Sequence, residues 1–143
     1  MGIYLNPENV DFQEVLNSKI YVDKSELIQY TNSVLRTTQK YICVSRPRRF
    51  GKSMAANMLT AYYSRGCDSR KLFQGLKIAT HPDFEKHLNQ YNVIHLNMQS
   101  FLSKTQTIEQ MIALVTKAVG RDLLRAYPDA DYLDKTILTF MLD

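Results

Sequence analysis

The residues of this 143-residue chain that are best suited to chemistry are the consecutive Gly51, Lys52 and Ser53. Glycine has no Cβ, so its backbone can approach a ligand closely and adopt unusual dihedral angles. A lysine ammonium at this position can reach the outer phosphates of a nucleotide, and a serine hydroxyl can bind a phosphate-bound Mg²⁺. The tripeptide therefore predicts a phosphate-binding loop.

Such a loop needs a strand before it and a helix after it, and the sequence predicts both. The apolar run Tyr41–Val44 is typical of a buried strand, Ser45–Pro47 interrupts it, and residues 54–65 have the character of a helix. The unpaired amides and the dipole at the start of that helix favour an anion. The alternative is a basic surface turn that joins a strand to a helix.

The loop departs from the usual pattern, in which a glycine, any four residues and then Gly-Lys-Ser or Gly-Lys-Thr follow one another. Here Arg46 occupies the position of the first glycine. The spacing and the final tripeptide are kept, but the opening glycine is lost.

Four motifs in order resemble the AAA-ATPase-like family, a prokaryotic family of predicted AAA-type ATPases. In chain order they are residues 21–28, Ser45–Ser53, 71–78 and 91–97. In the second of them Arg46 replaces the glycine, as it does in the family. Members of that family often carry a nuclease-like domain of the PD-(D/E)xK type at the C-terminus. The resemblance covers most of the chain and implies ATP and Mg²⁺ as cofactors.

The resemblance also implies which residues form the site. The variant Walker A loop would bind the nucleotide through Arg46, Pro47, Arg48, Arg49, Phe50, Gly51, Lys52, Ser53 and Met54. Ser53 would also hold Mg²⁺ through the nucleotide. Tyr21 could stack on a base, whereas the simpler interpretation of Tyr21, Asp23 and Lys24 is the end of a strand followed by a helix cap.

The expected fold is a P-loop-like three-layer α/β/α unit with a partial parallel sheet and flanking helices. Its strands would be Tyr41–Val44 and 92–97, and residues 1–36 would lead into a P-loop core at 37–143. The predicted helices are residues 9–17, 26–35, 54–65, 82–89, 108–127 and 132–142.

A strand that ends in Asp or Glu, which a loop-type ATPase uses to hold Mg²⁺ and polarise water, does not occur in the sequence. We expect the chain to stop just before this Walker B strand, and so to bind ATP but hydrolyse it poorly. The family resemblance also allows a homo-oligomer.

The charge distribution fits an anionic ligand. Residues 36–77 contain ten basic residues and one acid, Asp68, in a chain of net charge +4. The same basic stretch supports an alternative function, a nucleic-acid-binding module, and an inactive fragment is a third interpretation. The sequence shows neither a signal peptide nor a long apolar span, which favours a cytoplasmic protein without a membrane partner. Cys43 is expected to fill a small space in the core.

Overall fold

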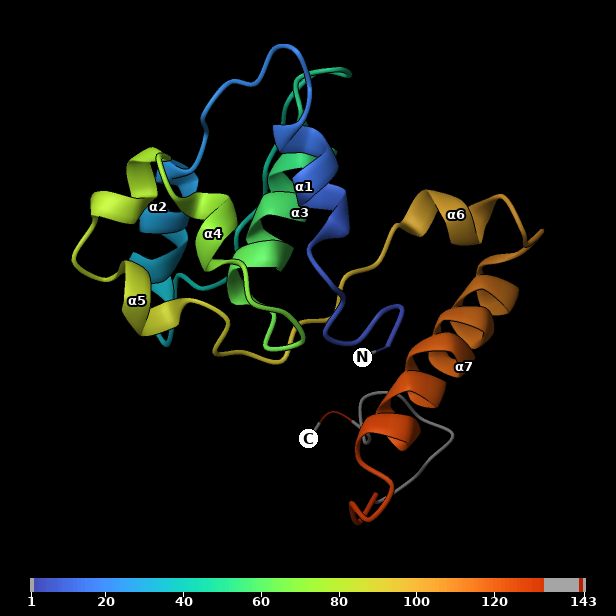
Figure 1. The fold of residues 1–143 in the computed structure, drawn as a ribbon. Coiled ribbons are helices and arrows are strands. Elements are labelled where there is room, and N and C mark those ends of the chain that lie inside the picture. Colours follow the sequence, from blue (N-terminus) through green and yellow to red (C-terminus); the bar gives the residue numbers. More distant parts are fainter. Residues whose placement is uncertain (1, 133–141, 143) are drawn as a thin grey trace. The chain divides into compact units, whose positions relative to one another are not determined.

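The computed structural model describes residues 2–132 and 142 (Figure 1). The chain divides into two compact units. One is Glu8–Asn92, and the other combines Met1–Pro7 with Val93–Asp143. This division does not test the predicted boundary between residues 36 and 37, which stays a prediction.

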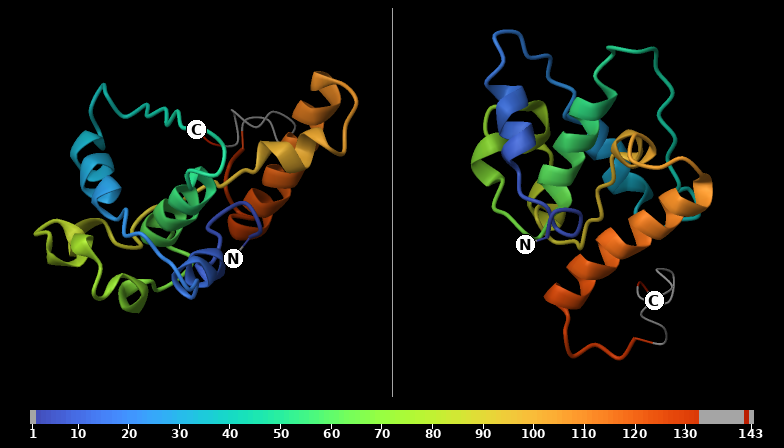
Figure 2. Two further views of the ribbon diagram at one scale, coloured as in Figure 1. Left: turned by 90° about the horizontal axis from the view of Figure 1, so that it is seen from above. Right: turned by 90° about the vertical axis from the view of Figure 1, so that its right-hand side faces the viewer.

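The unit Glu8–Asn92 is built from helices. They are α1 (Val10–Leu16), α2 (Glu26–Val34), α3 (Lys52–Tyr63), α4 (Arg70–Phe73), the 3₁₀ helix η1 (Lys77–Thr80) and α5 (Phe84–His87). Helix α1 lies beside α3, and η1 contacts both α2 and α5 (Figures 1 and 2). Helix α3 supplies Met58, Ala61 and Tyr62 to the buried core of this unit.

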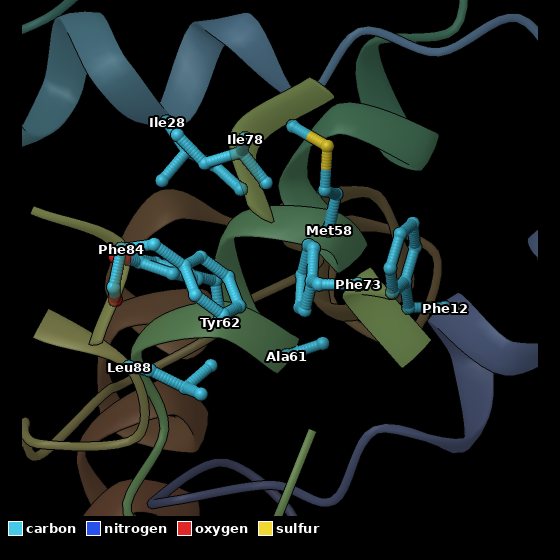
Figure 3. Close-up of a cluster of buried hydrophobic side chains, with 9 residues drawn as sticks. All are labelled: Phe12, Ile28, Met58, Ala61, Tyr62, Phe73, Ile78, Phe84 and Leu88. Carbon is cyan, nitrogen blue, oxygen red and sulfur yellow. The ribbon is translucent and has the colours of Figure 1, made fainter. Parts of the chain in front are cut away.

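Aromatic side chains dominate the core of this unit (Figure 3). Tyr62 is fully buried, with its ring centroid 5.6 Å from that of Phe73 and 5.7 Å from that of Phe84. Its hydroxyl donates to the Phe84 carbonyl at 2.7 Å and accepts from the Asn32 amide at 3.1 Å. A buried tyrosine needs such partners for its hydroxyl, and this one has two.

The other unit contains α6 (Met98–Leu102) and the long α7 (Ile108–Ala126). The N-terminal segment is attached to α7 by Asp122, which is 3% exposed. Its carboxylate accepts the backbone N–H of Tyr4 at 2.7 Å and that of Leu5 at 3.3 Å. Leu5 then packs against Val119 and Leu123 in a small apolar cluster. Burial of a polar group requires hydrogen-bond partners, and the Asp122 carboxylate finds them in these two backbone N–H groups.

The predicted α/β/α fold with a parallel sheet is wrong. The residues that the structure describes form no sheet, and their only pairings are isolated bridges, Leu5 with Ile94 and Ser64 with Tyr91. The run Tyr41–Val44 belongs to no strand, and Tyr41 is 85% exposed. An apolar β-branched run shows a preference for extended backbone, whereas a strand also needs a partner for its hydrogen bonds.

The predictions for two single residues, Cys43 and Asn97, are also wrong. Cys43 is exposed and fills no core, because it lies in this unpaired run. Asn97, predicted at the end of a second strand, instead caps α6, where its side chain accepts the N–H of Gln99 at 3.1 Å.

The longer helices were predicted well. Helix α7 ends one residue before the predicted 108–127, and Thr107 caps it by accepting the N–H of Gln110 at 3.2 Å. The predicted helix at 132–142 falls almost wholly on residues outside those described. Within the described part of the chain, every helix is too short or too polar to cross a membrane.

Candidate functional site: the loop before α3

Gly51 joins the loop to α3 and is the N-cap of that helix. Its φ of 77° and ψ of 25° are left-handed, a conformation that costs a residue with a Cβ roughly 1–2 kcal/mol. Its carbonyl accepts the N–H of Ala55 at 2.9 Å, the first hydrogen bond of the helix. A Cβ added to Gly51 would also lie 3.1 Å from the Nζ of Lys24. Backbone conformation and local space both favour glycine here.

Lys52 is the first residue of α3 and its side chain folds back over the loop. Its Nζ donates to the Arg46 carbonyl at 2.5 Å and to the Pro47 carbonyl at 3.2 Å. These two bonds close the segment between residues 46 and 52 into a ring around the ammonium. An ammonium has three N–H donors, so it keeps a donor for a further acceptor.

A second lysine holds the loop from outside. The Nζ of Lys24 donates to the Phe50 carbonyl at 3.0 Å. The backbone beside Lys24 is fixed by Asp23, whose carboxylate accepts the N–H of Ser25 and that of Lys77, both at 2.8 Å. Lys24 therefore reaches the loop from a segment that is anchored to η1.

The same contacts shift the ionisation of Asp23. Partial burial opposes the charged form, but the hydrogen bonds from Ser25 and from the Lys77 amide outweigh it, so the pKa of Asp23 lies below its ordinary value. The carboxylate is thus charged near neutral pH and holds the segment that carries Lys24.

Three arginines of this loop are exposed: Arg46, Arg48 and Arg49. Within residues 2–132 and 142, no carboxylate forms a salt bridge with any of them. Arg49 has a φ of 67°, a left-handed conformation that is unusual for a residue with a side chain. Such conformations gather at functional sites.

The first turn of α3 is open to a ligand. Ser53 and Met54 are exposed, and the turn contains no acidic residue. The first amides of a helix have no partner within it, and the helix dipole places about half a positive charge at this end. Together with Lys24, Lys52 and the arginines, the arrangement suits a multiply charged anion such as a polyphosphate.

The structure therefore brings the predicted residues 46–54 together as one continuous loop and helix start. Lys24 was not predicted to contact that loop. It lies 26 residues before Phe50, so no local spacing connects the two. The only signal for it was its position inside the family-like motif at residues 21–28.

A family model described as "Predicted AAA-ATPase" (AAA-ATPase-like) matches residues 10–141. The matched range contains the whole loop and both lysines that bind it. No curated protein and no solved structure matches the chain significantly.

Proposed function

This chain belongs to the AAA-ATPase-like family of predicted AAA-ATPases, and on that premise we propose that it binds Mg²⁺-ATP through residues 46–54. The family implies use of a nucleotide in general. Beyond that, we propose that this loop, with its variant Walker A pattern, is the nucleotide site and that its residues have the roles given below.

The observation that carries the proposal is the geometry at the start of α3. A left-handed Gly51 leads into a 12-residue helix, and Lys52 lies across the preceding loop. The carbonyls that Lys52 binds are neutral acceptors, whereas phosphate oxygens carry negative charge and attract the ammonium more strongly. A polyphosphate can therefore draw the ammonium away from them, and the residues present fit this ligand.

Each residue has a distinct role in this proposal. Lys52 neutralises the outer phosphates, and Ser53 offers its hydroxyl to Mg²⁺. When bound, the metal ion neutralises further phosphate charge. The exposed side chains of Arg46, Arg48 and Arg49 add positive charge around the phosphates.

The same exposed arginines support a second candidate, the binding of nucleic-acid phosphates. The two functions differ in their dependence on solution conditions. Nucleic-acid binding weakens steeply with salt because counterions are released. Binding at a magnesium-nucleotide site depends instead on Mg²⁺ and on the number of phosphates, so ATP and ADP should differ.

The test is the substitution Lys52→Ala with ATP binding measured by calorimetry in the presence of Mg²⁺. Loss of one hydrogen bond to a charged group costs about 1.5–3 kcal/mol, so we expect the affinity for ATP to fall roughly 10- to 150-fold. Lys40→Ala is the matched control, because Lys40 is an exposed lysine that precedes the loop and makes a cation–π contact with Tyr41. Equal ATP affinity in Lys52→Ala and the parent chain would refute the assignment.

A further inference from the structure

The peptide bond between Phe50 and Gly51 has a bound carbonyl and a free N–H. The Nζ of Lys24 donates to the Phe50 carbonyl at 3.0 Å. The N–H of Gly51 donates to no group among the described residues. The carbonyl and the N–H point to opposite sides of a trans peptide bond, and the described part of the chain has no cis bond. The Gly51 N–H is therefore turned away from Lys24.

Glycine at position 51 does not fix this orientation by its own preference. A flip of the peptide plane exchanges the directions of the carbonyl and the N–H, and it reverses the sign of φ at the second residue. Glycine adopts positive and negative φ about equally readily, so Gly51, whose φ is 77°, can accommodate both orientations. The hydrogen bond from Lys24 to the Phe50 carbonyl favours the observed one, because a flip would break it.

Lys24 extends from a backbone that is anchored on both sides. Asp23 accepts the N–H of Lys77, and Ser25, which is fully buried, accepts the N–H of Ile78 through its Oγ at 3.1 Å. The side chain of Lys24 itself is exposed and is not part of the core. An exposed side chain on a fixed backbone is suited to hold another segment in position.

We infer that Lys24 is a positioning residue of the proposed nucleotide site. By holding the Phe50 carbonyl, it keeps the Gly51 N–H directed at the phosphates. The inference rests on the proposed function, because it gives one backbone donor of that site its direction. An N–H forms a charge-assisted hydrogen bond with a phosphate, whereas the flipped peptide would present a carbonyl oxygen, which can only accept. Lys24 thus acts through the backbone, unlike Lys52, which neutralises the outer phosphates itself.

Lys24→Met tests this role, because methionine keeps a long unbranched side chain but has no N–H to donate. We expect the affinity for ATP, measured by calorimetry with Mg²⁺, to fall on the order of tenfold or more. Lys24→Arg should bind ATP within about threefold of the parent chain, since a guanidinium also donates to a carbonyl. Lys40→Met is the matched control, because it removes an exposed ammonium that lies over the ring of Tyr41.

The amide signal of Gly51 separates a positioning role from a direct contact with phosphate. The chain contains five glycines, so labelling with ¹⁵N-glycine gives a simple NMR spectrum, in which Gly51→Ala identifies the Gly51 signal by its loss. In the ligand-free chain we expect Lys24→Met to shift or broaden this signal, because the peptide then exchanges between two orientations. Lys24→Arg and Lys40→Met should leave the signal as it is in the parent chain.

The outcomes separate this inference from the proposed function. Parent-like affinity for ATP in Lys24→Met, together with a loss in Lys52→Ala, would overturn the role of Lys24 and leave the loop site standing. An equal loss in Lys40→Met would overturn it too, and so would weaker binding with an unchanged Gly51 signal, since Lys24 would then act on the ligand directly. If the parent chain does not bind ATP, the proposed function fails, and the inference fails with it.

Discussion

The two ends of α3 are held by different kinds of interaction. Toward its C-terminus, Met58, Ala61 and Tyr62 are at most 2% exposed and pack within the aromatic core (Figure 3). At its N-terminus, residues 52–54 are exposed, and so is the whole preceding segment 41–50. That segment is held chiefly by the ammonium groups of Lys24 and Lys52 on backbone carbonyls.

This difference separates stability from binding within one helix. Packing in the core cannot be exchanged for contacts to a ligand without unfolding. A hydrogen bond between an ammonium and a carbonyl can be exchanged, because a phosphate oxygen offers the ammonium a stronger acceptor. Loops that are held loosely on a rigid scaffold are where binding residues commonly lie.

The largest effect is expected at the buried end of α3. Tyr62→Ala removes an aromatic side chain from the core and leaves the Asn32 amide and the Phe84 carbonyl without their partner. We expect the free energy of unfolding in urea to fall by about 3–5 kcal/mol. Tyr41→Ala, at the 85% exposed tyrosine, should change it by less than about 0.5 kcal/mol. Similar losses in both variants would contradict the comparison.

A smaller effect is expected at the junction of loop and helix. Gly51→Ala forces a Cβ into a left-handed conformation and toward Lys24, so we expect a loss of about 1–2 kcal/mol in stability together with weaker ATP binding. Gly75→Ala is a close control, because its φ is 84° and an added Cβ would meet nothing within 4 Å. Urea unfolding should show similar losses in both variants, and calorimetry should show weaker ATP binding in Gly51→Ala alone. Weaker binding in both would mean that backbone strain, and not the site, explains the effect.

The smallest expected effect concerns Asp23, which anchors the segment carrying Lys24. Its pKa in the folded chain lies below the ordinary 3.8. The carboxylate therefore adds stability above that pH, and this stability is lost as the pH falls through the folded pKa. We expect Asp23→Asn to lower stability by less than about 1 kcal/mol at pH 7, since its hydrogen bonds are partly exposed.

The pH series supplies the check on Asp23. Urea unfolding of the parent chain and of Asp23→Asn should differ at pH 7 and converge as the pH falls below 3.8. A difference that is the same at pH 7 and at pH 3 would show that the charge of Asp23 does not contribute.

The features that the sequence predicted correctly are those that depend on residues close together in the chain. Apolar spacing located α7 to within one residue, because a helix is formed by residues close in sequence. That residues 46–54 bind phosphate stays a prediction. The sheet was predicted wrongly, since an apolar run at 41–44 cannot show whether a partner strand lies beside it.

Contacts over long distances in the sequence were not predictable from spacing. Lys24 reaches the carbonyl of Phe50 across 26 residues, and Asp23 accepts from the amide of Lys77 across 54. A cavity beside the loop combines three separate parts of the chain, among them Phe12, Tyr21 and Met58. Only the packed structure brings these groups together.

The attachment of the N-terminal segment by Asp122 has a consequence for the order of events during synthesis. The amide of Tyr4 is bonded to a carboxylate 118 residues later in the chain. At about 5–20 residues per second, a ribosome needs roughly 6 to 24 s to make the intervening chain. The unit Glu8–Asn92 can fold during that time, since its residues are made before Asp122. During that time the backbone N–H groups of Tyr4 and Leu5 cannot bond to the carboxylate of Asp122, which has not yet been made.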